Sequence, residues 1–110
     1  LSLFPNARGV IAIEDNKPEA IRLLTERTAS ESRITVQPLV TKYPQGGERM
    51  LIHAVTGRDI NSSMLPYDAG CIVDNVATVI AVYRAVVWNE PLTTTVMTVT
   101  GDAVNKPGNF

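Results

Sequence analysis

The sequence has few residues that carry metal or thiol chemistry. It contains one cysteine, Cys71, and one histidine, His53, among 110 residues. A single cysteine excludes a disulfide within the chain, and it excludes a cysteine-ligated zinc or iron–sulfur site built by this chain alone. A single histidine likewise excludes a site with several histidine ligands. We therefore expect no metal site made only of these residues, and no nucleophile–base pair is visible.

The sequence also has no large excess of positive or negative charge, and it has no long apolar run. Ten basic and eleven acidic residues give a net charge of -1, which provides no electrostatic footprint for nucleic acid. The apolar run at residues 79–82 is far shorter than the roughly 20 residues of a membrane span. No secretory signal is present, so the cytoplasm is the expected compartment. A hydrophobic content of 45% excludes intrinsic disorder.

The two ends of the chain predict a fragment. The first residue is Leu1 rather than methionine, and apolar side chains follow at Leu3 and Phe4. The last residue, Phe110, comes directly after the turn-forming residues 107–109. We expect one domain, or a piece of one, with elements missing on both sides.

The first half of the chain predicts a strand, a helix and a second strand. Residues 9–13 form a short β-branched run, as in a buried strand. A helix that ends near Ala29 follows, with Asn16 as the expected cap and Pro18 in the first turn. Residues 34–40 are the next strand. Because Pro38 cannot donate a backbone hydrogen bond, this strand should lie at an edge or break there.

The second half continues the alternation. A helix with apolar residues 50, 51, 54 and 55 on one face should end at Gly57. After a loop over residues 59–70, we predict a short strand at 71–73, a helix from Asp74 to about Trp88, and a strand at 94–99. Alternating strands and helices predict an α/β fold.

The loop at residues 43–48 (YPQGGE) is the strongest local signal. Gly46 and Gly47 would allow close approach of a ligand to the backbone, and the helix that follows presents free N–H groups to a phosphate. A second interpretation is a tight strand-to-helix turn, with Glu48 stabilising the helix start. The loop lacks the lysine and hydroxyl residues that end a P-loop.

Two other junctions offer polar side chains. Asp74 or Asn75 could simply cap the third predicted helix, or Asn75 and Thr78 could hydrogen-bond a ligand. Glu14 and Asp15 follow the first predicted strand, at the edge where α/β sheets bind ligands. These acids could hold ribose hydroxyls, or they could favour the start of a solvated helix.

Six segments, in order along nearly the whole chain, carry a family resemblance. They are residues 13–21 (IEDNKPEAI), 41–48 (TKYPQGGE), 56–58 (TGR), 65–66 (LP), 75–78 (NVAT) and 96–109 (VMTVTGDAVNKPGN). Together they resemble the RnfC subunit family of Rnf electron-transport complexes. That family is similar to the flavin- and NADH-binding subunit of respiratory complex I.

The resemblance implies a fold and a function. It implies a Rossmann-like three-layer α/β sandwich with a mostly parallel sheet, of which residues 1–92 would be the C-terminal part. Residues 93–110 would begin a truncated β-grasp domain. The implied cofactors are FMN and NADH, with two [4Fe–4S] clusters outside this fragment. The implied partners are the other Rnf subunits and, through them, ferredoxin. The implied location is peripheral, on the cytoplasmic face of the membrane. Electron transfer would be coupled to ion transport across that membrane.

The resemblance also points to particular residues. Tyr43, Gly46 and Glu48 match the Tyr-Ile-Cys-Gly-Glu-Glu-Thr loop of the complex I subunit, whereas Gly47 replaces its first glutamate. Asn75 and Thr78 match an Asn-Asn-Val-Glu-Thr segment and become FMN-binding candidates. The chemistry would belong mainly to the flavin, and the isolated fragment should show no turnover.

Two alternatives remain open at this level. The chain could be a stand-alone ligand-binding or complex-assembly module without redox activity, which the absence of catalytic residues allows. It could also belong to a paralogue with the same core, such as a propanediol-utilisation cobalamin reductase or a proline-reductase electron-transfer protein.

Overall fold

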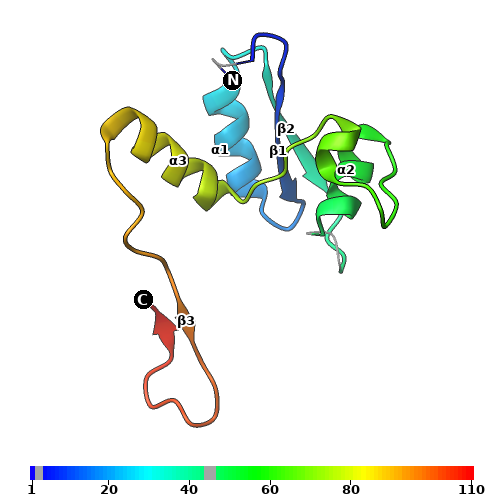
Figure 1. Cartoon of the computed structure of the whole chain (residues 1–110). Coiled ribbons are helices and arrows are strands. Elements are labelled where there is room, and N and C mark those ends of the chain that lie inside the picture. The colour runs from blue at the N-terminus through cyan, green and yellow to red at the C-terminus, as the bar shows by residue number, and fades with distance from the viewer. Residues whose placement is uncertain (2–3, 44–46) are drawn as a thin grey trace. The chain divides into compact units, whose positions relative to one another are not determined.

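The computed structural model describes residue 1, residues 4–43 and residues 47–110. Their contacts divide the chain into two compact units, Leu1–Val73 and Asp74–Phe110. The elements of both units are labelled in Figure 1. They make a mixed α/β chain with a parallel pair of strands and three α-helices in the described residues, which confirms the α/β class expected from the sequence.

A parallel pair of strands forms the centre of Leu1–Val73. β1 (Gly9–Glu14) pairs with β2 (Ile34–Leu39), and the register places Glu14 opposite Leu39 at the carboxyl ends of both strands. Both strands were predicted to within one residue. Pro38 was expected either to place this strand at an edge or to break it, and the structure has the edge position, because β2 continues through Pro38. Among the described residues β2 pairs only with β1, so the strand tolerates a residue that lacks an N–H group.

Two helices accompany the strands in this unit. α1 (Pro18–Thr28) connects β1 to β2, since parallel strands need a crossover rather than a tight hairpin. Figure 1 shows the strand pair between α1 and α2 (Glu48–Thr56), with α1 contacting β2 and α2 contacting β1. The predicted cap at Asn16 is wrong. Lys17 occupies the N-cap because its N–H donates to the Glu14 carbonyl at 3.2 Å and closes a turn.

The buried apolar side chains of this unit come from three elements. Leu39 of β2, Ile52 of α2 and Ala69 of a short 3-10 helix, η1 (Pro66–Ala69), are each less than one-tenth exposed. The Gln37 amide adds a polar link between strand and helix by donating to the Ala54 carbonyl at 3.3 Å. α2 is therefore held against the strand pair mainly through its one buried residue, Ile52.

α2 ends as predicted at Gly57. This glycine has a φ of 71°, and its N–H donates to the His53 carbonyl at 2.8 Å. A left-handed residue at this place satisfies one of the last carbonyls of the helix, and glycine adopts that conformation without steric cost.

Replacing Gly57 with alanine is expected to lower the free energy of unfolding by about 1 kcal/mol, because a Cβ disfavours positive φ. Apart from Gly57 and its two chain neighbours, no heavy atom of the described residues lies within 4 Å of the position of that Cβ, so the loss would come from the backbone alone. Asparagine tolerates left-handed backbone, so Gly57→Asn is the matched control and should lose less. Urea denaturation of both variants checks this, and equal losses would contradict it.

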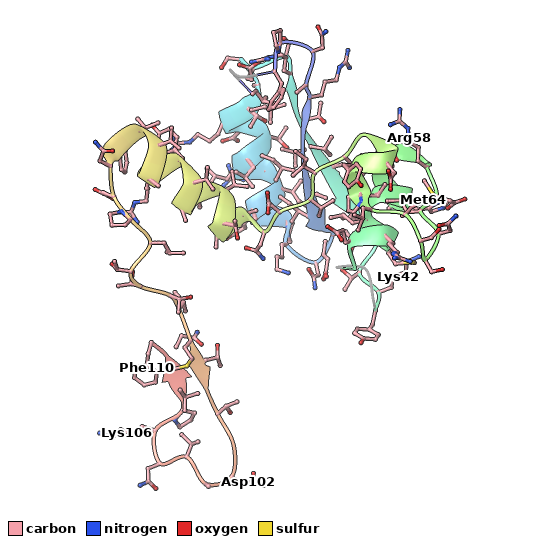
Figure 2. All side chains as sticks on the ribbon, in the orientation of Figure 1. Lys42, Arg58, Met64, Asp102, Lys106 and Phe110 are labelled. Atoms are coloured by element: carbon pink, nitrogen blue, oxygen red, sulfur yellow. The ribbon has the colours of Figure 1, made fainter. Side chains whose placement is uncertain are left out.

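The predicted strand at residues 71–73 is wrong. These residues follow η1 without strand pairing, and the Cys71 N–H donates to the Pro66 carbonyl at 3.1 Å. The guanidinium of Arg58, labelled in Figure 2, donates a hydrogen bond to the Ala69 carbonyl and so links this turn to the end of α2. The apolar, β-branched pattern was therefore misleading, because a strand exists only where a partner accepts its hydrogen bonds.

The second unit contains a helix and a small antiparallel pair. α3 (Val76–Trp88) ends as predicted, whereas the predicted strand at 94–99 is reduced to β3 (Thr98–Val99), paired with β4 (Gly108–Asn109). Reciprocal hydrogen bonds of 2.7 and 2.9 Å between Met97 and Phe110 extend this pairing by one step.

α3 is apolar on every side. Thr78 and Arg84 are the only strongly polar residues in its sequence, VATVIAVYRAVVW. Near its end, the Tyr83 and Trp88 rings meet edge to face with centroids 5.4 Å apart, and the Arg84 guanidinium lies 5.9 Å from the Trp88 ring. A helix that is hydrophobic all round is typical of the interior of a larger protein.

Candidate functional site

The carboxyl end of β1 is joined to the segment that follows β2 by one side chain. Asp15 Oδ1 accepts two hydrogen bonds from Thr41, one from its backbone N–H at 3.1 Å and one from its hydroxyl at 2.6 Å. The Asp15 N–H in turn donates to the Leu39 carbonyl at 2.7 Å. Asp15 therefore holds the chain at the point where it leaves the sheet toward the glycine-bearing loop.

The contacts with Thr41 favour the ionised form of Asp15. Hydrogen bonds from the Thr41 hydroxyl and from the Thr41 N–H lower the pKa of the Asp15 carboxyl below its ordinary value of 3.8. The carboxylate is thus charged at neutral pH, and hydrogen bonds to a charged acceptor are stronger than neutral ones.

Glu14 occupies a different position from its neighbour. It is the last residue of β1, lies opposite Leu39, and is only partly exposed. Its carbonyl accepts the hydrogen bond that places Lys17 at the start of α1. The two acids proposed from the sequence therefore belong to one strand end, but only Asp15 contacts the segment after β2 in the hydrogen bonds found.

Of the predicted loop at residues 43–48, the structure describes Tyr43, Gly47 and Glu48. Tyr43 is 98% exposed, and Gly47 is the N-cap of α2, with an extended backbone. Glu48 is the first helical residue. Gly46 lies outside the described residues. Lys42, labelled in Figure 2, adds a positive charge to the start of this loop.

The first turn of α2 has donors that no capping side chain uses. Gly47 has no side chain, and no side chain among residues 1, 4–43 and 47–110 caps this helix, although the Gly47 carbonyl accepts from the Leu51 N–H at 2.8 Å. The N–H groups of a first helical turn lack partners within the helix, and they carry a partial positive charge. The negative charge of Glu48 in the same turn is also stabilised by this partial positive charge. Phosphate binding and stabilisation of the helix start by Glu48 would therefore use the same N–H groups.

Asn75 and Thr78 lie at the start of α3. Asn75, rather than Asp74, is the N-cap, because its Oδ1 accepts a hydrogen bond from the Ala77 N–H at 2.9 Å. Since this oxygen is used by the cap, the amide Nδ2 is the group through which Asn75 could donate to a ligand. Thr78 lies one turn into the helix and is exposed. These two residues belong to Asp74–Phe110, whereas the acids and the glycine loop belong to Leu1–Val73.

The comparison with protein families decides which family this is. The Nuo51 FMN-binding domain matches residues 1–84, more than three-quarters of the chain. This chain belongs to the Nuo51 FMN-binding domain family. The match includes Asp15, Thr41 and Gly47, together with Asn75 and Thr78 at the start of α3.

Curated relatives of this chain are RnfC-type subunits of oxidoreductase complexes. It is 44% identical over 100 residues to such a subunit of the Na(+)-translocating ferredoxin:NAD(+) oxidoreductase complex of Acetobacterium woodii, covering 91% of this chain and 23% of that protein. It is 43% identical over 101 residues to the corresponding subunit of the ion-translocating oxidoreductase complex of Yersinia enterocolitica, covering 92% of this chain and 14% of that protein. The Salmonella arizonae counterpart is 44% identical. The resemblance to RnfC is confirmed, and the chain spans less than a quarter of these relatives.

Within residues 1, 4–43 and 47–110, no helix combines the length and the apolar character needed to cross a membrane. The same part of the chain contains no group of three or more His, Cys, Asp and Glu side chains placed to hold a metal ion.

Two polar contacts of the FMN-binding domain were missed by the sequence interpretation. Thr41 was noted only as part of a matching segment, although it is the partner of Asp15. His53 was treated as isolated, yet its Nδ1 lies 2.7 Å from Asp59 Oδ1, with both side chains exposed. The available signal was Gly57, because a glycine stop turns the chain back toward the last turn of the helix and so brings Asp59 near His53.

Proposed function

We propose that this chain is part of the flavin-binding domain of an RnfC-type protein, which passes electrons between NADH, FMN and iron–sulfur clusters. The observation that carries the proposal is the 43–44% identity to RnfC-type relatives over more than nine-tenths of the chain. The match of residues 1–84 to the Nuo51 FMN-binding domain supports FMN as the bound flavin. The oxidoreductase activity belongs to the longer protein, and the isolated chain is expected to have no turnover.

The proposed partners and location follow from the same relatives. The longer protein would assemble with other subunits of an ion-translocating ferredoxin:NAD oxidoreductase complex, and it would exchange electrons with ferredoxin through that complex. Two [4Fe–4S] clusters would be bound outside residues 1–110, because this chain has only Cys71. The protein would be peripheral on the cytoplasmic face of the membrane, without a role in nucleic-acid binding.

The donors at the two helix starts are of the types that FMN requires. A flavin mononucleotide presents a phosphate, hydroxyls and a ring with several acceptors. The first-turn N–H groups after Gly47 are of the kind that suits a phosphate. The Asn75 amide and the Thr78 hydroxyl are donors of the kind that suits hydroxyl or ring acceptors. Tyr43, Gly46 and Glu48 are proposed as further cofactor-binding residues. When bound, the flavin supplies hydride acceptance and single-electron transfer, and the protein positions it.

The acids at the end of β1 are proposed to serve the nucleotide side of this site. Ligands of α/β sheets bind beyond the carboxyl ends of the parallel strands, where Glu14 and Asp15 lie. Glu14 is the candidate for a direct contact with ribose hydroxyls. Asp15 Oδ1 already holds Thr41, so Asp15 is proposed to support the site rather than to contact the ribose.

We further propose the domain arrangement implied by the family. Residues 1–92 would be the C-terminal part of a Rossmann-like three-layer domain, and residues 93–110 would begin a β-grasp domain. The parallel β1–α1–β2 crossover and the apolar α3 support the first part. The antiparallel β3–β4 pair supports the second.

Flavin binding tests the proposal. The longer natural protein and the 110-residue chain are titrated with FMN, and quenching of flavin fluorescence is recorded. We expect saturable quenching by the longer protein only, because residues 1–110 supply part of the site. If the longer protein fails to bind FMN, the flavin assignment is wrong and an assembly module is favoured. Turnover of NADH by the 110-residue chain would contradict its predicted inactivity.

A further inference from the structure

Asp15 and Thr41 form a contact that the sequence did not suggest. The two residues are 26 positions apart, and one carboxylate oxygen accepts both hydrogen-bond donors of Thr41. The parallel register brings them together, since Glu14 and Leu39 end their strands opposite each other. The contact therefore lies at the edge of the sheet where the proposed site begins.

Thr41 also lies close in sequence to a proposed cofactor residue. Tyr43 follows it by two residues and is 98% exposed, so packing does not hold its side chain. The position of the backbone that carries Tyr43 then depends on how the chain is fixed just before it. In the described residues that fixation is the pair of hydrogen bonds from Thr41 to Asp15.

We propose that Asp15 is a positioning residue for flavin binding, which holds Thr41 and thereby places Tyr43 at the cofactor, rather than a residue that contacts the ribose itself. This inference rests on the proposed function, because it assumes that residues near Tyr43 bind the flavin. It differs from the sequence interpretation of Asp15, which pointed to a direct ligand contact.

Four variants of the longer protein test the positioning role. Thr41→Val removes the hydroxyl donor and keeps the β-branched shape, whereas Thr41→Ser retains the hydroxyl. Asp15→Ala removes the acceptor, and the double variant Asp15→Ala/Thr41→Val measures coupling. Asp102→Asn controls for the loss of one negative charge at a residue in the β3–β4 connection, labelled in Figure 2.

The expected results are ordered by the hydrogen bonds that remain. Asp15→Ala removes both hydrogen bonds and should weaken FMN binding by about tenfold, whereas Thr41→Val removes only the one from the hydroxyl and should weaken it by about threefold. Thr41→Ser and Asp102→Asn should bind as the natural protein does. The double variant should be no weaker than Asp15→Ala, because the acceptor of the Thr41 hydroxyl is already gone. If Asp15→Ala weakens binding while Thr41→Val does not, Asp15 contacts the ligand directly and the proposal is wrong.

Hydrogen exchange separates failure of this inference from failure of the proposed function. Mass spectrometry of a peptide that covers residues 41–48 should show faster exchange in Asp15→Ala and Thr41→Val than in Thr41→Ser, without any cofactor present. Unchanged exchange in both variants would overturn the positioning role even if FMN binds. A natural protein that binds no FMN would overturn the proposed function and this inference with it.

Discussion

Replacing Ile52 with alanine is expected to lower the free energy of unfolding of Leu1–Val73 by about 2–5 kcal/mol. Ile52 is 3% exposed and is the only buried residue of α2. Alanine would remove most of the one buried apolar side chain of α2, and it would leave a cavity in a small core. The loss is large compared with the roughly 5–15 kcal/mol that stabilise a typical domain.

An exposed aliphatic residue provides the matched control for Ile52. Leu23 of α1 is 47% exposed, and its replacement by alanine should change the free energy of unfolding by only about 0.5 kcal/mol. Alanine also has a high helix propensity, which offsets part of the lost packing. Urea denaturation followed by circular dichroism measures both variants. Equal effects would show that α2 is not held by Ile52.

The second large effect concerns Asn75, where capping and cofactor binding can be separated. In the longer protein, Asn75→Asp should keep the cap of α3, because aspartate accepts the Ala77 N–H as well as asparagine does. It should also lose the amide donor and add a negative charge near the phosphate-bearing flavin. We expect FMN affinity to fall by about 10- to 100-fold, as for the loss of a hydrogen bond with added charge repulsion.

Asn75→Ala completes the comparison. It removes both the cap and the amide, so it should lower stability by about 1 kcal/mol and also weaken FMN binding. Thermal denaturation gives the first effect, and quenching of flavin fluorescence gives the second. If Asn75→Asp binds FMN as tightly as the natural protein, Asn75 serves only as a helix cap, and its assignment to the cofactor site is wrong.

Local signals were sufficient for several features of the site. A glycine stop at Gly57 and glycines before a polar first turn are short-range patterns, and α2 begins and ends where they indicate. The start of α3 was left open between Asp74 and Asn75. Both are good caps, so propensity could not choose between them, and the hydrogen bond to Ala77 identifies Asn75.

Pairing between distant residues could not be predicted in the same way. Residues 71–73 have the composition of a strand, but the Cys71 N–H donates to the Pro66 carbonyl instead of to a neighbouring strand. The contact between Asp15 and Thr41 likewise depends on a register between strands 25 residues apart in sequence. Neither outcome is encoded in a window of a few residues, because both depend on which hydrogen-bond partner the fold brings close.

The sequence by itself determined the α/β class, the bounds of β1, α1, β2, α2 and α3 to within about two residues, and the family resemblance, since these follow from periodicity, turn residues and short matching segments. Only the tertiary structure decided that Asp15 Oδ1 is occupied by Thr41, that Ile52 carries the packing of α2, and that residues 71–73 are not a strand. The physical reason is that burial and hydrogen-bond pairing are properties of atoms that meet in space, whereas helix starts and stops are set by neighbours along the chain.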